Sequence, residues 1–209
     1  MYNNIMKKIS KATLQRYPVY LKALKKAKSD GLDKIMSSDL AKYVDIKSTT
    51  IRRDFSLIGT FGKQGYGYDV DKLIEIFSKQ LGGDYNEKII LIGCGNFGKT
   101  LLNYNGWDDV VGKIDCAFDL HPDKVKNVNV PVYHIKDLEK KLPEGCRIAI
   151  LAVSGDVQET VDKLAKVGIK GIVDMTHQHF TVPSGVTVKY VDIVSMIQEL
   201  VFSTNMLNR

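Results

Sequence analysis

A buried-strand pattern that runs into a glycine-rich turn constrains the fold of this chain more than any other feature. Four aliphatic residues, 89–92, lead directly into Gly93-Cys94-Gly95-Asn96-Phe97-Gly98, and residues 99–103 continue as a helix. A GxGxxG turn between a strand and a helix is typical of a dinucleotide-binding unit, because its glycines allow a tight turn, a close approach of pyrophosphate and helix–strand packing. The helix N-terminus then offers unpaired N–H groups to negative charge.

An acidic residue at the expected distance supports the same interpretation. Residues 114–119 are predicted to form the next strand, and Asp119 lies 21 residues after Gly98. A carboxylate at this position accepts hydrogen bonds from the adenosine ribose and repels a 2′-phosphate, and no arginine follows it. We therefore predict NAD(H) rather than NADP(H) as the cofactor. A Rossmann-like core that binds no ligand is the structural alternative.

The rest of the C-terminal half continues the alternation of strands and helices. We predict strands at 147–153, 171–174 and 186–191, and a helix at 157–167. Buried apolar strands that alternate with helices indicate a parallel sheet. The final stretch, 192–207, is an amphipathic helix that either packs on its own domain or is exchanged with a partner.

The N-terminal half differs from this in charge. Residues 1–85 hold 16 Lys and Arg against 9 Asp and Glu, whereas residues 86–209 hold 14 against 15. A first helix is predicted at 13–28, with a start or a kink near Pro18. Ser37, Ser38 and Asp39 supply N-cap chemistry for a short helix, and Ser48 is predicted to cap a helix that runs from 49 to 58 and stops at Gly59. Two short capped helices joined by a tight turn are typical of a helix-turn-helix.

The second of these helices carries donors suited to DNA around a predicted buried face of Ile51, Phe55 and Ile58. Its N-terminal part would meet base edges in the major groove. Residues 61–68 alternate aromatics, glycines and polar side chains, which favours a two-stranded wing, and Asp69 then caps a helix to about residue 81. Two plainer interpretations stay open: arginines that only solvate a helix face, and a hairpin with structural glycines. The predicted DNA contacts are Ser48, Thr49, Thr50, Arg52, Arg53, Lys63, Gln64 and Tyr66.

Composition excludes several classes of protein. No apolar run approaches the roughly 20 residues that span a bilayer, and no apolar stretch follows the N-terminal charges as in a secretory signal. The three cysteines form no CxxC pair, so we expect neither a metal site nor a disulfide framework. We expect a cytoplasmic protein with no membrane partner. Cys94 could act as a redox thiol beside a helix N-terminus, although a small residue that fits the loop is the simpler interpretation.

The motifs, taken in order, closely resemble the Rex family of redox-sensing transcriptional repressors. The resemblance covers nearly the whole chain and lies in ATLQRYPVYLKAL, SSDLAKYVDIKSTTIRRDFSLIGTFG, GYGYDVDKL, IGCGNFGKTLLNYNGW, AFDLHP and VDIVSMIQEL. It implies a winged-helix DNA-binding domain at 1–81, a Rossmann-like NAD(H)-binding domain at 86–191, and a C-terminal helix at 192–209 that is swapped between the subunits of a homodimer. It also implies that the protein is not an enzyme, that it represses genes of fermentation and anaerobic respiration from a double-stranded operator, and that NADH releases it.

Site residues follow from the resemblance position by position. Tyr104 would lie near the nicotinamide, Phe202 would cover the partner's nicotinamide, and Arg16 and Asp192 would pair across domains as a switch contact. The full set of predicted cofactor residues is Gly93, Cys94, Gly95, Asn96, Phe97, Gly98, Tyr104, Asp119 and Phe202. This chain departs from the family at Gln64, where many relatives place a cation, at Val153-Ser154 in place of a Val/Ala-Pro pattern, and at 174–177 in place of an Asn-Phe-type segment beside the cofactor.

Two rival functions are compatible with parts of the sequence. An NAD-dependent oxidoreductase would need a general acid or base near the hydride site. Of the four histidines, His121 lies at the ribose end and His134 is best read as structural, which leaves His177 and His179 as candidates, although loop roles suit them better. The other rival is a scaffold that binds CoA or another nucleotide and whose N-terminal module binds protein.

Overall fold

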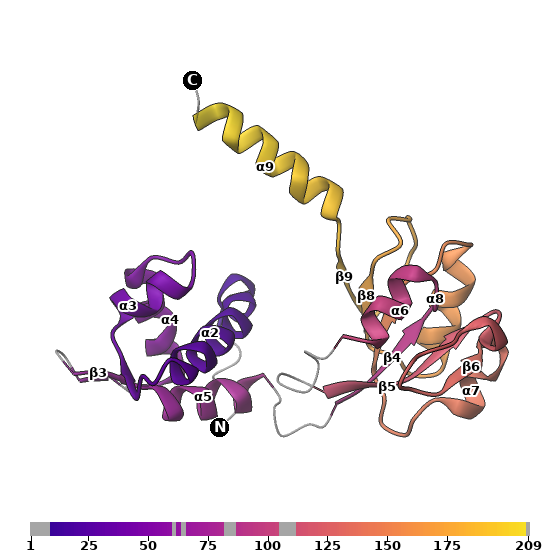
Figure 1. The fold of residues 1–209 in the computed structure, drawn as a ribbon, viewed down its shortest axis with the longest axis horizontal. Helices are drawn as coiled ribbons and strands as arrows, with labels where there is room; N and C mark the ends of the chain where they lie inside the picture. The colour runs from indigo at the N-terminus through magenta and orange to yellow at the C-terminus, as the bar shows by residue number, and fades with distance from the viewer. Residues whose placement is uncertain (1–8, 60–61, 64–65, 82–86, 105–111, 208–209) are drawn as a thin grey trace. The chain divides into compact units, whose positions relative to one another are not determined.

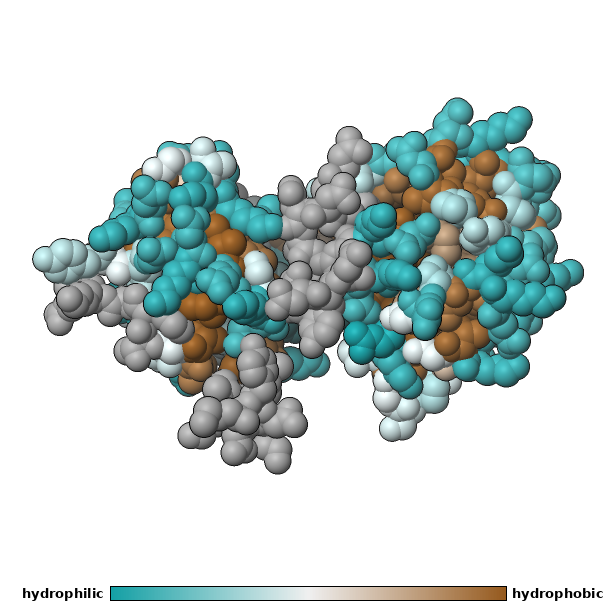
Figure 2. Space-filling model, turned by 90° about the horizontal axis from the view of Figure 1, so that it is seen from below, coloured by the Kyte–Doolittle hydropathy of each residue, from teal (hydrophilic) through white to brown (hydrophobic). Residues whose placement is uncertain are grey.

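The structure, a computed structural model, describes residues 9–59, 62–63, 66–81, 87–104 and 112–207. The chain divides into two compact units, Met1–Tyr85 and Asn86–Arg209. On the face shown in Figure 2, hydrophilic residues cover much of each unit, with smaller patches of hydrophobic residues between them. In the described residues, no helix is long and apolar enough to cross a membrane.

The described part of the N-terminal unit combines helices with a small antiparallel sheet (Figure 1). The helices are α2 (Lys11–Ser29), α3 (Ser37–Tyr43), α4 (Ser48–Ile58) and α5 (Val70–Gln80). Strands β1 (Lys34–Ile35), β2 (Gly62–Lys63) and β3 (Gly67–Asp69) pair in the order β1-β3-β2. The paired α3 and α4, followed by a hairpin and α5, form the predicted winged helix.

Helix boundaries confirm two predictions and correct others. Asp69 caps α5 by accepting from the Lys72 amide, and Gly59, with φ of 140°, ends α4. The first helix starts before Pro18, since Ser10 caps α2 and the helix continues through the proline. Ser37 and Ser48 were predicted to be caps, and this is wrong. Each is the first residue of its helix, and the cap positions are Met36 and Lys47, which make no side-chain cap bond.

Aromatic rings from three elements build the core of the N-terminal unit. Phe55 of α4 lies 5.4 Å from Tyr20 of α2 and 5.3 Å from Phe77 of α5, measured between ring centroids. Ile51 and Phe55 are buried as predicted, but Ile58 at the end of α4 is only partly buried. Because α4 contributes its buried face to this cluster, its opposite face is left for solvent or a ligand.

Within its described residues, the C-terminal unit is built on a sheet of six parallel strands. They are β4 (Glu87–Ile92), β5 (Gly112–Asp119), β6 (Val132–His134), β7 (Ile148–Leu151), β8 (Gly171–Asp174) and β9 (Thr187–Tyr190). Their order is β6-β5-β4-β7-β8-β9, so the chain reverses direction across the sheet between β4 and β7. In such sheets ligands bind outside the carboxyl ends of the strands at this switch point.

Alternation along β4 divides the core of this unit between the two sheet faces. Ile90 and Ile92 belong to one buried cluster, and Ile89 and Leu91 belong to the other. The helices are α6 (Asn96–Leu102), α7 (Leu138–Lys141), α8 (Val157–Lys166) and α9 (Ile193–Leu207), with short 3₁₀ turns η1 (Pro122–Lys124) and η2 (Ile135–Asp137). Strands β7 and β9 are shorter at both ends than predicted, whereas β8 has the predicted bounds.

Helix α9 differs from the others because its apolar side chains are exposed. The exposed fraction of Phe202 is 67%, and that of Leu200 is 62%. Ile193, Val194, Met196, Ile197, Val201 and Met206 are likewise more than half exposed. Apolar surface of this extent on one helix indicates an interaction site.

Candidate dinucleotide site and DNA-binding surface

The glycine-rich loop lies between the ends of three strands. The Gly93 amide donates to the Phe118 carbonyl oxygen of β5 (2.8 Å), and the Ala152 amide beyond β7 donates to the Ile92 carbonyl oxygen (2.8 Å). Gly93 has φ of 95°, and a Cβ there would lie 2.6 Å from the Ala152 carbonyl oxygen. Both the left-handed backbone and the crowding require glycine at this position.

The other two glycines differ in what surrounds them, and the difference fits a dinucleotide. A Cβ on Gly98 would overlap the Gly93 carbonyl oxygen, so Gly98 is required for the helix to pack against the loop. A Cβ on Gly95 would meet nothing within 4 Å. Two glycines therefore serve the protein's own packing, and the third leaves an open side where a pyrophosphate can approach the backbone.

Asp119 holds the loop and still has free acceptor capacity. Its Oδ2 accepts from the Cys94 amide (2.7 Å), and its Oδ1 accepts from the His121 amide (2.8 Å). A carboxylate offers about four lone-pair positions. With two of them used, the partly exposed Asp119 can accept ribose hydroxyls while it orients the glycine-rich loop.

A cleft of about 510 Å³ lies on the other side of β4 from Asp119. Gly95, Asn96, Phe97, Ala152, Val153, Ser154, Met175, Thr176 and Gln178 line it, so it joins the ends of β4, β7 and β8. Two of the segments at which the sequence was expected to depart from the Rex pattern, 153–154 and 174–177, contribute residues to this lining. We call this cavity the cofactor cleft. Its volume is in the range of small-molecule sites.

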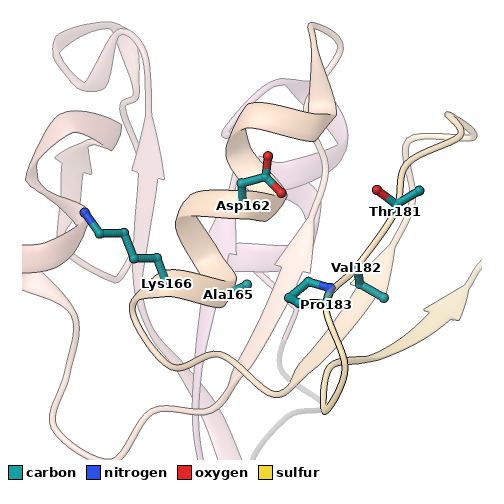
Figure 3. Close-up of a pocket in the computed structure, with 6 residues that line it drawn as sticks. All are labelled: Asp162, Ala165, Lys166, Thr181, Val182 and Pro183. Atoms are coloured by element: carbon teal, nitrogen blue, oxygen red, sulfur yellow. The ribbon is translucent and has the colours of Figure 1, made fainter.

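Tyr104 and Phe202 are not among the residues that line the cofactor cleft. Tyr104 follows α6 and is 61% exposed, and Phe202 lies on α9. Their predicted roles beside the nicotinamide stay predictions. A further cavity of about 500 Å³ lies along α8 and residues 181–183 (Figure 3). Its lining includes none of the predicted site residues.

The cysteine of the loop is not suited to thiol chemistry. Cys94 is buried, and burial, with a smaller effect of the Asp119 carboxylate, raises the pKa of its thiol to about 12. A thiolate is the reactive form, so this cysteine is inert at neutral pH. The structure favours the interpretation of Cys94 as a small residue that fits the loop.

Helix α4, the predicted DNA-binding helix, exposes some of its predicted DNA contacts to solvent. Thr49, Arg52 and Arg53 are exposed, while Ser48 and Thr50 are partly buried. Arg52 donates to the Ser37 hydroxyl of α3 (3.1 Å), so it also ties the two helices of the motif together. The Arg53 carbonyl oxygen accepts from the Ser56 hydroxyl (2.6 Å), but its side chain makes no hydrogen bond or ion pair within the part of the chain that the structure describes, which leaves the guanidinium available.

The wing is described only in part. The hairpin of β2 and β3 is present, but Phe61 and Gln64 lie outside the described residues, and so does the side chain of Lys63. Tyr66 is 69% exposed, and the Lys34 Nζ lies 5.9 Å from its ring centroid. A cation beside an exposed aromatic ring at the hairpin suits a surface that meets DNA.

A buried carboxylate on α4, that of Asp54, was missed by the sequence analysis. Asp54 is 1% exposed, and it accepts from Arg16 through Nε (2.6 Å) and Nη2 (2.8 Å) and from the Tyr20 hydroxyl (2.7 Å). Thr13 donates to it at 3.3 Å. Burial acts to raise the pKa of Asp54, but the bonds from Arg16 and Tyr20 outweigh burial and lower it. The signal available in the sequence was its position between Ile51 and Phe55 on the buried face.

The two residues of the predicted switch each have partners within their own unit. Arg16 is paired with Asp54 of α4, and this pairing raises the pKa of the guanidinium. Asp192 accepts from the Ser195 amide (2.9 Å) and hydroxyl (2.6 Å) at the start of α9. A pairing of Arg16 with Asp192 stays a prediction.

Two family models match parts of both units, and curated relatives match nearly all of the chain. The model described as "Putative DNA-binding protein N-terminus" matches residues 8–56, and the model described as "CoA binding domain" matches residues 84–178. The chain is 42% identical over 203 residues to the "Redox-sensing transcriptional repressor Rex" of Anoxybacillus flavithermus, covering 96% of both chains. It is 40% identical to the protein of the same name in Listeria welshimeri, covering 93% of both chains.

Solved structures give a similar result. A structure described as RSP in complex with beta-NAD⁺ and operator DNA is matched with a TM-score of 0.85 and 28% identity, over 96% of this chain and 94% of that one. A structure of RSP in complex with beta-NADH is matched with a TM-score of 0.83 and 26% identity, over 96% of both chains.

Proposed function

Since the chain belongs to the Rex family of redox-sensing transcriptional repressors, we propose that it binds operator DNA through α4 and the wing and that NADH releases it. The observation that carries this proposal is the glycine-rich loop, open only at Gly95, with Asp119 at the end of the neighbouring strand. These features lie in a chain that matches curated Rex repressors along nearly its whole length. The relatives are named as repressors and not as enzymes, which sets aside the oxidoreductase.

We assign the cofactor to the edge formed by the carboxyl ends of β4, β5, β7 and β8. Gly93, Gly95 and Gly98 would hold the pyrophosphate, Asp119 the adenosine ribose, and the cofactor cleft the nicotinamide. When bound, NADH supplies a neutral ring and NAD⁺ a cationic one. Val153 and Met175 give the cleft apolar walls, and apolar surroundings penalise a buried charge.

Coenzyme A is the second candidate ligand, because one family model is described by it. Its adenosine carries a phosphate on the ribose, where this chain places the carboxylate of Asp119. Two negative groups close together disfavour each other. The loop and Asp119 therefore favour NAD(H), and CoA belongs in the binding experiment as a competitor.

The proposed DNA surface is the solvent-facing side of α4. Thr49 and Arg53 lie exposed near its N-terminal half, the part of a recognition helix that meets base edges. Basic side chains that neutralise phosphates make affinity fall steeply as salt rises. The N-terminal unit carries the positive charge of the whole chain, which supports this assignment.

We further propose that the protein works as a homodimer that exchanges α9. The exposed apolar side chains of that helix indicate that a partner covers it, and a second copy of the chain can bury this helix while its own identical helix is buried in return. Phe202 would then lie over the partner's nicotinamide, and a palindromic operator would match the twofold axis. Such a repressor acts in the cytoplasm, where the DNA of the relatives' organisms lies.

A titration tests the proposal. Labelled palindromic duplexes with candidate operator sequences are bound by the purified chain, and NADH, NAD⁺ and CoA are added separately while fluorescence anisotropy is followed. We expect salt-sensitive binding that saturating NADH weakens at least tenfold, with a smaller effect of NAD⁺ and none of CoA. Operator occupancy that does not respond to NADH would contradict the proposal, as would a response to CoA alone.

A further inference from the structure

The segment that follows β8 lies on the wall of the cofactor cleft and is hydrogen-bonded to the end of that strand. Asp174, the last residue of β8, is 2% exposed, and its Oδ1 accepts from the Thr176 amide (3.0 Å) and the Thr176 hydroxyl (2.7 Å). The Gln178 amide donates to the same hydroxyl (3.3 Å). Thr176 and Gln178 both line the cleft. A group that enters the cleft therefore presses on a segment whose backbone is tied to the end of the sheet.

Between these two residues the chain turns through His177. Its φ is 57°, a left-handed conformation that few non-glycine residues adopt. The His177 side chain is not part of the cleft lining. Instead its Nδ1 lies 3.6 Å from Oδ1 of Asp192, within ion-pair distance when the imidazole is protonated. His177 therefore joins two cleft-lining residues along the chain to a carboxylate outside the cleft.

Asp192 directly precedes α9. Its two oxygens accept from the amide and hydroxyl of Ser195 in the first turn, and these bonds lower the pKa of the carboxyl group. A cavity of about 330 Å³ lies where the segment meets this helix start, lined by Asp174, His177, Gln178, His179, Tyr190, Val191 and Asp192. The space beside the contact allows the imidazole and the helix start to move relative to each other.

We propose that His177 is a positioning residue that transmits occupancy of the cofactor cleft to α9 by contacting Asp192. The inference rests on the proposed function and names the residue through which its regulation passes. Occupancy of the cleft displaces Thr176 and Gln178, the displacement moves His177, and His177 biases the capping carboxylate at the base of α9. Coupling between two sites needs such an element with two arrangements that both sites can bias. Here the element is the junction of β9 and α9.

The test measures coupling rather than affinity. For the full chain, the ratio of operator affinity without and with saturating NADH is measured by fluorescence anisotropy, and NADH affinity is measured by calorimetry. His177→Gly keeps the backbone conformation accessible and removes only the imidazole. We expect it to reduce the ratio about threefold to tenfold, within the range of coupling changes from such residues. NADH affinity and operator affinity without NADH should stay within about twofold, because His177 lines neither binding surface.

Two variants make the result specific. His179→Gly removes the neighbouring histidine, which lines the same small cavity and makes no hydrogen bond or ion pair with Asp192 among the described residues, and it should leave the ratio unchanged. His177→Asn tolerates the left-handed backbone and keeps a side-chain donor, so it should restore part of the ratio. Hydrogen exchange of the first turn of α9 should slow on NADH addition in the unaltered protein and respond less in His177→Gly.

The outcomes separate the two proposals. A wild-type ratio of one removes the proposed function and this inference with it. A normal wild-type ratio that His177→Gly leaves unchanged refutes the inference alone. Equal losses in His177→Gly and His179→Gly refute it too, since the effect would then come from the loop in general.

Discussion

Replacement of Asp54 by alanine should lower the stability of α4 and its packing in the N-terminal unit, without affecting the C-terminal unit. The substitution removes the acceptor of four hydrogen bonds from Arg16, Tyr20 and Thr13. Removal of one partner from a buried ion pair costs about 3 to 5 kcal/mol. Arg16 is 26% exposed and can regain some hydration, which reduces the cost. The Tyr20 hydroxyl stays buried without its acceptor, which adds about 1 to 3 kcal/mol.

We therefore expect the N-terminal unit to lose about 3 kcal/mol of stability, a more than hundredfold rise in the population of the open form. The single tryptophan lies in the C-terminal unit, so its fluorescence does not report on this change. Hydrogen exchange measured by mass spectrometry on peptides from α4 reports on this change. Protection of α4 should fall, and peptides from β4 and β7 should exchange as before.

Two further variants complete this experiment. Asp39→Ala breaks an exposed ion pair with Lys42 and should leave the exchange of α4 unchanged. In a double-mutant cycle, Arg16→Ala should cost much less in the Asp54→Ala background than alone. A loss below about 1 kcal/mol for Asp54→Ala, or additive effects in the cycle, would refute the argument that this buried pair anchors α4.

Three further predictions follow from the same geometry. Asp119→Asn keeps an acceptor for the Cys94 amide but weakens acceptance from ribose hydroxyls. Calorimetry should therefore show about tenfold weaker NADH binding, with unchanged operator affinity. Equal losses of both affinities would contradict the separation of the two sites. Arg53→Ala should weaken operator binding by about tenfold and lower the slope of log affinity against log salt, while NADH affinity stays constant, and a steeper slope would count against a phosphate or base contact. The pKa of Asp54 is lowered on folding, so the carboxylate stabilises the folded state above its unfolded pKa, which is near 4. This contribution is lost as pH falls through the folded pKa. An acid titration followed by hydrogen exchange of α4 should show the loss in the wild type and not in Asp54→Asn.

Local patterns in the sequence were enough for the central strands β4, β5, β7, β8 and β9, for the helices α2, α4, α5 and α8, and for the glycine-rich loop, whereas β1 and α7 were not predicted. The run from Ile89 to Gly98 specifies strand, turn and helix through short-range sterics, and the structure places Gly93 and Gly98 where a side chain would collide. Asp69 caps the start of α5 through a hydrogen bond, and Gly59 ends α4 through its backbone angle, and both effects are set within a few residues. The N-caps at Ser37 and Ser48 were wrong by one position, since each serine is the first helical residue and the cap positions before them, Met36 and Lys47, make no side-chain bond to the helix.

Side-chain partners distant along the chain were decided only by tertiary structure. Arg16 and Asp54 are 38 residues apart, and nothing in either local pattern predicts that α2 and α4 pack with these groups face to face. The same holds for His177 and Asp192, which meet because β8 and β9 are neighbours in the sheet and both end at the same edge. A local pattern determines which conformation a segment prefers, since its energy depends on adjacent residues. Which charged groups meet depends on how the finished elements pack, and that is a property of the whole fold.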